Sequence, residues 1–190
     1  MFVVDDFLDA ESCRRLCAEM RASAMTPATV GQDGKEAIDA EVRAARWATV
    51  SKESKLWMRE RLRAVQPMLE KHFVMKLADC QPPQFLVYRT GDFYTAHSDD
   101  GRSGDYAAYV RERLLSVVLF LNERSITEEP HTYEGGALTF TELIDDPRLS
   151  PYVYPLAGER GLLVAFRSNV VHGVAPVVRG ERYTVVSWFV

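Results

Sequence analysis

The second half of the chain is a series of short apolar runs with no helical pattern between them. These runs are rich in Val, Leu, Phe and Tyr and cover residues 84–89, 114–121, 137–141, 161–167, 172–178 and 182–190. Turn signals punctuate the series at Gly135-Gly136, Ala157-Gly158 and Arg179-Gly180. Parallel strands need long crossover connections, usually helices, so this order argues against a βαβ fold. It predicts a mainly β fold: an antiparallel double-sheet barrel of the jelly-roll type.

The first 80 residues carry two helical patterns, and we expect these helices to pack outside the barrel. Asp9 can cap a first helix that ends near Thr26-Pro27. Its apolar positions follow the three-four spacing of one buried face, at Cys13, Leu16, Cys17, Met20 and Ala24. A second helix begins near Ser51, and Pro67 inside it predicts a kink or a split, because proline removes a backbone hydrogen bond. Residues 31–50 show little periodicity and predict an irregular segment at the rim.

Length and composition suit one domain. With 190 residues, 47% of them hydrophobic, the chain can build a single core, so we expect a helical part at 1–80 and the jelly-roll core at 84–190. The net charge is −4 and no basic block is present, so nucleic acid is not expected as a partner. No secretory signal and no apolar run of roughly 20 residues is found. Cys13, Cys17 and Cys80 are expected to be buried and reduced, which favours a cytoplasmic protein without a membrane segment.

A candidate metal site is formed by His97-x-Asp99 and His172. Two residues apart on a strand share one face, so His97 and Asp99 can bind one ion side by side, and His172 is the best candidate for a third ligand. Each signal is weak alone, since His-x-Asp pairs occur by chance and a histidine flanked by valines is often a core residue. Together, two histidines and one carboxylate leave three adjacent positions of an octahedral ion open, as in non-haem Fe(II) oxygenases.

Arg182 comes ten residues after His172 and opens the last apolar run. Its planar guanidinium can pair in bidentate fashion with the far carboxylate of a chelating dicarboxylate such as 2-oxoglutarate. Thr184 lies two residues further, on the same strand face, where its hydroxyl can bond that carboxylate too. Trp188 continues this face and is expected to pack in the core.

Several of these segments carry a family resemblance. They are the tyrosine- and glycine-containing lead 88–94 before His97-Ser98-Asp99, the central strand 115–122, the glycine-pair strand 135–140, and the segments 172–177 and 180–183. Together they resemble the Fe(II)- and 2-oxoglutarate-dependent dioxygenases, and within them the prolyl 4-hydroxylase-like group. The resemblance implies a double-stranded β-helix. One departure separates the chain from the collagen-type members, which carry a lysine at the position of Arg182.

The resemblance also implies roles for individual residues. His97, Asp99 and His172 would ligate Fe(II), Arg182 would anchor 2-oxoglutarate, Tyr94 would contact the cosubstrate, and Tyr88 would line its pocket. The implied reaction consumes O2, releases succinate and CO2, and hydroxylates a C–H bond, with ascorbate as a candidate additional reductant. The substrate would be a protein side chain of the prolyl type or a small molecule.

Two alternatives remain open at this point. A cupin-like metal-dependent isomerase or hydrolase would use the same ligands without needing Arg182, and a non-catalytic barrel would only bind a ligand. The long insertions 100–113 and 122–134 are expected to form a substrate lid or, alternatively, surface loops. Tyr106, Tyr109 and Val110 are spaced for a short helix in the first.

Overall fold

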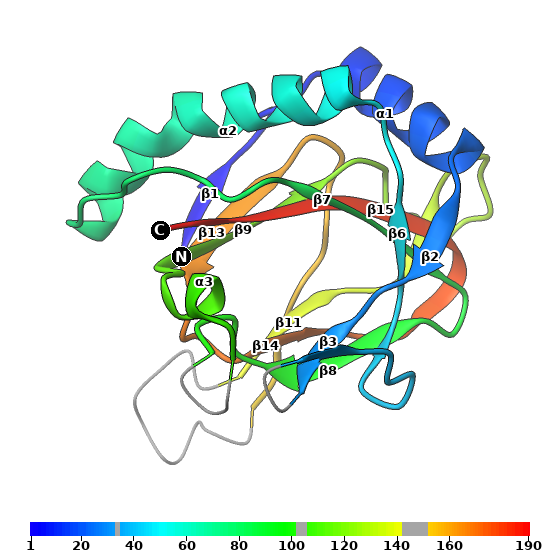
Figure 1. The fold of residues 1–190 in the computed structure, drawn as a ribbon. Helices are drawn as coiled ribbons and strands as arrows, with labels where there is room; N and C mark the ends of the chain where they lie inside the picture. The colour runs from blue at the N-terminus through cyan, green and yellow to red at the C-terminus, as the bar shows by residue number, and fades with distance from the viewer. Residues whose placement is uncertain (33–34, 102–105, 142–151) are drawn as a thin grey trace.

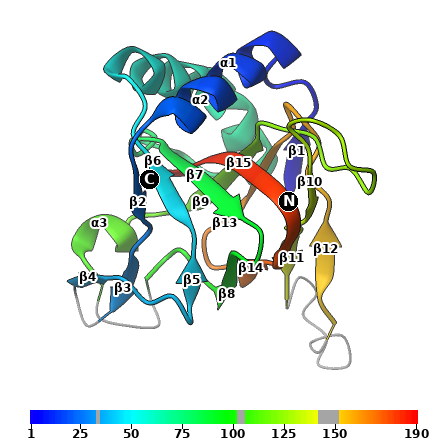
Figure 2. The same ribbon diagram turned by 90° about the vertical axis from the view of Figure 1, so that its right-hand side faces the viewer.

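The computed structural model describes residues 1–32, 35–101, 106–141 and 152–190. Two antiparallel sheets face each other, and both long helices cover the outer face of the larger sheet (Figures 1 and 2). This arrangement confirms the predicted mainly β, jelly-roll-type architecture with helices outside. Within the described ranges, no helix is long and apolar enough to cross a membrane.

The larger sheet has strand order β1-β13-β9-β15-β7-β6-β2, and β10 pairs with β15 beside this path. The bounds are β1 (Phe2–Val4), β2 (Met25–Pro27), β6 (Arg46–Ala48), β7 (Gln84–Arg89), β9 (Leu115–Phe120), β10 (Tyr133–Gly135), β13 (Leu163–Arg167) and β15 (Val177–Phe189). The long strand β15 lies between β7 and β9 at the centre. Side chains on one of its faces therefore meet the helices, and those on the other face meet the second sheet.

The smaller sheet has strand order β12-β11-β14-β8-β5. Its bounds are β5 (Arg43–Ala44), β8 (Phe93–His97), β11 (Leu138–Phe140), β12 (Tyr154–Leu156) and β14 (His172–Val174). A separate hairpin joins β3 (Val30–Gln32) and β4 (Lys35–Ala37), and the expected short helix in the first insertion is α3 (Ala108–Arg111). Part of that insertion, 102–105, lies outside the described residues.

The two long helices form as the caps and apolar spacing predict. Helix α1 (Ala10–Ala22) begins where the Asp9 carboxylate accepts a hydrogen bond from the Ser12 N–H at 2.7 Å. It ends before the predicted Thr26-Pro27, because residues 25–27 extend as β2 and pair with β6. Helix α2 (Lys52–Phe73) runs through Pro67 as one helix, so the predicted split is wrong. Buried side chains on both sides of the proline, including Val65 and Leu69, pack against the sheet and stabilise the helix across it.

Two further expectations are wrong. Residues 31–50 are not irregular, because β3 to β6 lie there; strands of two or three residues are too short to show an apolar period. The run 172–178 is two strands, divided around Ala175 and Pro176, and β15 continues through the expected turn at Arg179-Gly180. Gly180, at φ +80°, instead lets the backbone of β15 lie close to that of Thr132: a Cβ there would lie 2.4 Å from the Thr132 carbonyl oxygen.

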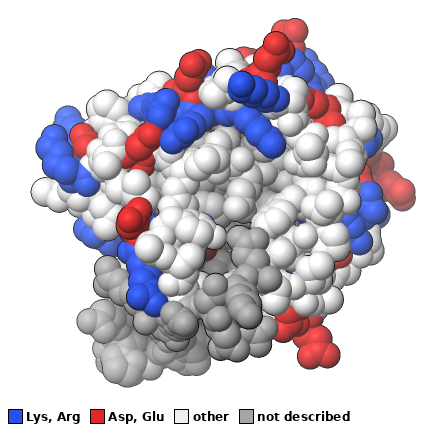
Figure 3. Space-filling view, in the orientation of Figure 1, with Lys and Arg blue, Asp and Glu red and all other residues white. Residues whose placement is uncertain are grey.

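The core has two layers. One lies between the helices and the larger sheet and contains the three free, buried cysteines. The other lies between the two sheets, where it surrounds a cavity of about 380 Å³. On the face seen in Figure 3, Lys and Arg side chains are interspersed with Asp and Glu along the helices rather than gathered in one groove.

Candidate metal centre

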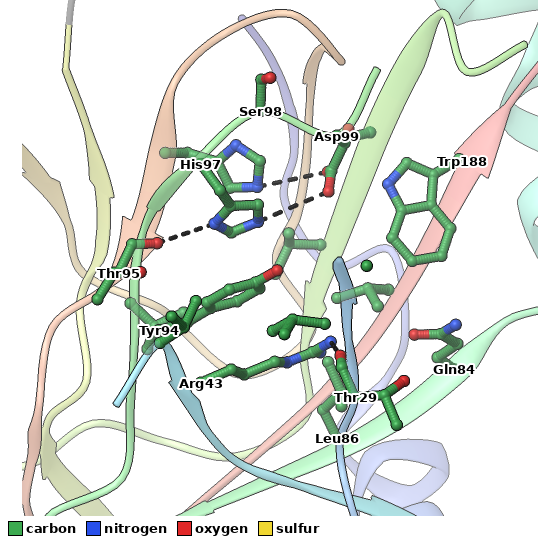
Figure 4. A pocket seen from close by; sticks show the side chains of 18 of the residues that line it. Thr29, Arg43, Gln84, Leu86, Tyr94, Thr95, His97, Ser98, Asp99 and Trp188 are labelled. Carbon is green, nitrogen blue, oxygen red and sulfur yellow. Dashed lines mark hydrogen bonds and ion pairs between the residues drawn. The ribbon is translucent and has the colours of Figure 1, made fainter. Parts of the chain in front are cut away.

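The cavity between the sheets brings His97, Asp99 and His172 together. His97 Nε2 lies 3.6 Å from Asp99 Oδ1, His172 Nε2 lies 3.4 Å from Asp99 Oδ2, and the three ligand atoms all lie within 4.8 Å of one another (Figure 4). His97 ends β8 and His172 begins β14, and the two residues are direct partners in the pairing of these strands. Gly173 permits that pairing, since a Cβ there would lie 2.8 Å from the Tyr94 carbonyl oxygen.

Asp99 reaches the cluster from a different position than expected. Strand β8 ends at His97, so Asp99 lies just beyond the strand rather than on its face. Its backbone N–H donates to the Ser168 carbonyl at 2.8 Å, and the Ser116 hydroxyl donates to Asp99 Oδ2 at 2.7 Å. These two bonds fix Asp99 in place, so its carboxylate lies beside the two histidines although β8 has already ended.

Both imidazoles are oriented by backbone carbonyls. His97 Nδ1 lies 2.9 Å from the Thr95 carbonyl oxygen, and His172 Nδ1 lies 3.0 Å from that of Val170. A carbonyl accepts only from an N–H, so in each ring Nδ1 is the protonated nitrogen and Nε2 presents its lone pair to the cluster. This tautomer is the one a metal ligand needs, and the outer bond holds the ring in place.

The protonation of the cluster follows from burial and mutual charge. Burial opposes the charged form of Asp99, but attraction to His172 and His97 in their protonated forms holds the pKa of Asp99 well below its ordinary value. Burial alone would lower the pKa of His172, yet its interaction with Asp99 raises it. Burial and the neighbouring His172 lower the pKa of His97. One carboxylate and two imidazoles that can be neutral together are a suitable donor set for a divalent cation.

Arg182 is the second unusual feature of the cavity. Its side chain, on β15, is 1% exposed and lies between the rings of Tyr88 and Phe120, at 5.1 and 4.9 Å from their centroids. Nη1 donates to Thr184 Oγ1 at 3.4 Å, whereas Nε and Nη2 have no hydrogen-bond partner among the described residues. A buried charge without an anion is costly. The arrangement therefore fits an anionic ligand that enters the cavity.

The remaining predicted residues also line the cavity. The ring of Tyr94 stacks on that of His97 with centroids 3.6 Å apart, while Tyr88 and Thr184 lie next to Arg182. Trp188, expected to pack in the core, is buried but faces the cavity, and its indole N–H has no partner in the described structure (Figure 4). Burial raises the pKa of Tyr94 above its ordinary value.

Sequence reasoning missed Tyr133. Its hydroxyl is buried without a hydrogen-bond partner in the described part of the chain, and burial raises its pKa while the positive charge of Arg182 lowers it. Gly136, at φ +57°, packs between the two residues: a Cβ there would lie 2.9 Å from Arg182 Cδ and 3.4 Å from Tyr133 Cε2. The glycine pair was a signal, because it marks the point where a backbone approaches Arg182 closely.

Known proteins resemble this chain in sequence and in structure. The model of the 2OG-Fe(II) oxygenase superfamily matches residues 83–190, the part that contains the histidine and aspartate cluster and Arg182. A PKHD-type hydroxylase of Maricaulis maris is 36% identical over 101 residues, which cover 53% of this chain and 38% of that protein. One from Parvibaculum lavamentivorans is 34% identical over 136 residues, covering 65% and 50%. The chain thus matches half or less of the length of these curated relatives.

Among solved structures, a prolyl-4-hydroxylase of Pseudomonas putida has the same fold. It superposes with a TM-score of 0.72 at 26% sequence identity, and the match covers 99% of this chain and 90% of that chain. The likeness therefore includes the N-terminal helices as well as the sheets.

Proposed function

The chain belongs to the 2OG-Fe(II) oxygenase superfamily, and on that premise we propose that it hydroxylates a C–H bond of its substrate with 2-oxoglutarate as cosubstrate. In the balanced reaction, O2 contributes one oxygen atom to the new hydroxyl and one to succinate, and CO2 leaves. The observation that carries the proposal is the presence, in one cavity, of a three-ligand cluster and a buried arginine with no carboxylate partner among the described residues.

His97, Asp99 and His172 would hold the iron. The Nε2 atoms of both imidazoles face the cluster, and the Ser116 hydroxyl keeps one oxygen of Asp99 in position. When bound, Fe(II) would be chelated by the 2-oxo acid and would supply the redox chemistry that activates O2. With one carboxylate against a dication, the site keeps a net positive charge that favours an anionic chelator.

Arg182 would bind the far carboxylate of 2-oxoglutarate. Its free Nε and Nη2 donors offer two parallel hydrogen bonds, which a carboxylate accepts in bidentate geometry. The Thr184 hydroxyl, already bonded to Nη1, and the unpaired hydroxyl of Tyr133 are the neighbouring groups that can complete this anion site. Tyr88 walls the guanidinium on one side and Tyr94 stacks on a ligand histidine, so both would restrict how the cosubstrate lies.

Two observations bear on the class of substrate. The solved relative is a prolyl-4-hydroxylase, which supports a prolyl-type side chain in a protein or peptide as the substrate. The cavity of about 380 Å³ falls within the size range of small-molecule pockets, so a free metabolite fits as well. Apolar walls, including Leu86 and Val186, would exclude water from the reacting C–H bond.

The test is succinate formation by the purified protein with Fe(II), 2-oxoglutarate, O2 and ascorbate, screened against proline-containing peptides and a metabolite panel. We expect turnover in the wild type, its loss in His172→Ala, and a raised 2-oxoglutarate requirement in Arg182→Ala. Turnover of a substrate without 2-oxoglutarate, unchanged in Arg182→Ala, would instead favour a metal-dependent isomerase or hydrolase. Absence of succinate with every candidate would favour a barrel that only binds its ligand.

A further inference from the structure

Two more arginines, Arg43 and Arg113, line the same cavity in addition to Arg182. Arg43 lies on β5, on the side of the cavity formed by Tyr94, and Arg113 precedes β9 and lies over Trp188 (Figure 4 shows Arg43, Tyr94 and Trp188). Neither forms an ion pair with an acidic side chain in the ranges that the structure describes. Neither arginine belongs to the proposed iron ligands or to the proposed 2-oxoglutarate site.

Arg113 is held rigidly. Its guanidinium carbon lies 3.6 Å from the centroid of the Trp188 ring, and its Nε–H donates to Gln81 Oε1 at 3.0 Å. Gln81 is itself fixed, because its side-chain amide donates to the Tyr109 carbonyl at 2.6 Å and its backbone N–H to the Trp188 carbonyl at 2.7 Å. These contacts occupy the ring face and one nitrogen of Arg113, so the two terminal nitrogens remain available as a fork.

Arg43 is arranged in a similar way. Its guanidinium lies 4.6 Å from the centroid of the Tyr94 ring, and Nη1 donates to the Thr29 carbonyl at 3.0 Å. Its Nε is buried and has no hydrogen-bond partner in the described structure. Both arginines are therefore preorganised by an aromatic ring and a neutral acceptor, without neutralisation of their charge.

The described residues that line the cavity do not balance its charges. Burial lowers the pKa of Arg113; Asp99 opposes this effect, and the positive charge of Arg43 adds to it, so the two guanidiniums repel each other across the cavity. Apart from Asp99, Asp39 is the other carboxylate in the described lining, and its Oδ1 accepts from the Glu41 N–H at 3.0 Å. Fe(II), Asp99 and Arg182 together balance the two charges of 2-oxoglutarate. Arg43 and Arg113 against Asp39 still leave one positive charge in excess.

We infer that the substrate carries a carboxylate, which Arg113 binds with its terminal nitrogens while Arg43 adds a second positive charge. This inference rests on the proposed function, since it concerns the substrate of that site. It makes the two arginines specificity-determining residues. The carboxylate can belong to a small molecule, such as the α-carboxylate of an amino acid, or to an Asp or Glu side chain in a peptide. In both cases the neutral amide analogue should bind worse, because it cannot balance the charge.

The test uses matched carboxylate and carboxamide probes on the anaerobic protein loaded with Fe(II) and saturated with 2-oxoglutarate. One arm compares the N-acetyl derivatives of all the common amino acids with their amides. The other compares end-blocked tripeptides that contain Asp or Glu with those that contain Asn or Gln. Binding is measured by calorimetry and ligand-observed NMR. We expect the carboxylate of at least one pair to bind about tenfold or more tightly than its amide, as for a charge-assisted hydrogen-bonded pair. The arm in which this preference occurs identifies the source of the carboxylate.

Variants assign the preference to the two arginines. Arg113→Gln and Arg43→Gln should each reduce it about tenfold, whereas Arg113→Lys should keep part of it because the charge remains. Arg15→Gln is the matched control: Arg15 also stacks on an aromatic ring, that of Trp57 at 4.8 Å, but is exposed and does not line the cavity. If one cavity variant fails to fold, the other and the wild-type preference still decide the question.

The charge-transfer absorption of Fe(II) with bound 2-oxoglutarate separates this inference from the proposed function. Its absence from the wild type would count against the proposed function itself. If the absorption is present and no pair shows a preference, whether both members bind equally or neither binds, the inference of an anionic substrate is overturned. A preference that persists unchanged in both Arg113→Gln and Arg43→Gln would overturn the assignment to these residues.

Discussion

Replacing Arg182 by methionine should make the ligand-free protein more stable and 2-oxoglutarate binding weaker. Two nitrogens of the guanidinium have no acceptor among the described residues, and the side chain is 1% exposed. Each unsatisfied buried donor costs about 1–3 kcal/mol, which the cation–π contacts with Tyr88 and Phe120 offset by about 1–2 kcal/mol each. Replacement of a buried charge by an apolar side chain of similar size should therefore raise the free energy of unfolding by up to about 4 kcal/mol.

Binding should change in the opposite sense. Loss of a bidentate, charge-assisted pair should weaken 2-oxoglutarate by about 100-fold, or roughly 3 kcal/mol. The assay is thermal and urea unfolding of the metal-loaded protein with and without 2-oxoglutarate, together with calorimetric titration of the cosubstrate. For a domain of this size, the ligand-free melting temperature should rise by roughly 2–4 °C per kcal/mol, and the further increase caused by 2-oxoglutarate in the wild type should disappear.

Two controls define what would refute this reasoning. Arg182→Lys keeps the charge but loses the planar fork, so its affinity for 2-oxoglutarate should be intermediate. Arg14→Met removes an exposed arginine from the surface of α1 and should change stability by only about 0.5 kcal/mol or less. If Arg182→Met destabilises the ligand-free protein and leaves the affinity for 2-oxoglutarate intact, Arg182 is a structural residue and not an anion site.

Three further predictions concern pH and the glycine pair. Iron affinity should fall by up to tenfold per pH unit below the pKa of His172, because a protonated imidazole cannot bind a metal. The neighbouring Asp99 raises this pKa above the ordinary 6.5. An affinity that does not change with pH in anaerobic titrations between pH 5 and 8 would contradict this prediction. Asp79→Asn should destabilise the fold by about 1 kcal/mol at neutral pH; the effect is kept this small because solvent screens a carboxylate that is 38% exposed. Hydrogen bonding to an arginine of α2 lowers the pKa of Asp79 from 3.8 to about 2. In urea unfolding, the difference in stability between the variant and the wild type should therefore shrink as pH falls through this interval. A difference that stays constant would show that the Asp79 charge is not its cause. Gly136→Ala should weaken 2-oxoglutarate binding in a calorimetric titration because a Cβ would meet Arg182 at 2.9 Å. Gly91→Ala also places alanine at a positive φ, +86° against +57° at Gly136, but with nothing within 4 Å, so it should leave binding unchanged. Equal effects would mean that backbone strain alone acts.

The architecture was predictable because its largest elements have long, regular patterns. Apolar spacing and caps located both long helices, and the lack of long helices between the strands after residue 84 indicated an antiparallel double sheet. The segments that could not be predicted are the shortest ones. Strands β3 to β6 have two or three residues each, and their extended conformation depends on pairing with β7, β8 and each other rather than on a local period. The continuity of α2 through Pro67 likewise depends on tertiary packing.

Some residues of the candidate site were likewise predictable from the sequence, and others were not. His97, Asp99, His172, Arg182 and Thr184 were identifiable because two-residue spacing and the placement of strands bring them to one cavity. Asp99 reached it even though its strand ends two residues earlier.

The residues that were missed approach the cavity through contacts that local sequence patterns do not specify, although the glycine pair marks the one at Tyr133. Arg43 arrives on a two-residue strand, Arg113 is positioned by Gln81 and Trp188, and Tyr133 meets Arg182 through the close approach at Gly136. Prediction of these positions requires the pairing of the sheets, which local patterns do not contain.

The most direct test of the account is an anaerobic absorption titration of the protein with Fe(II) and 2-oxoglutarate. We predict that a charge-transfer band develops at one equivalent of iron in the wild type and that it is lost in His172→Ala. A wild type without the band, or a band of full intensity in the variant, would show that residues 97, 99 and 172 do not form the iron site.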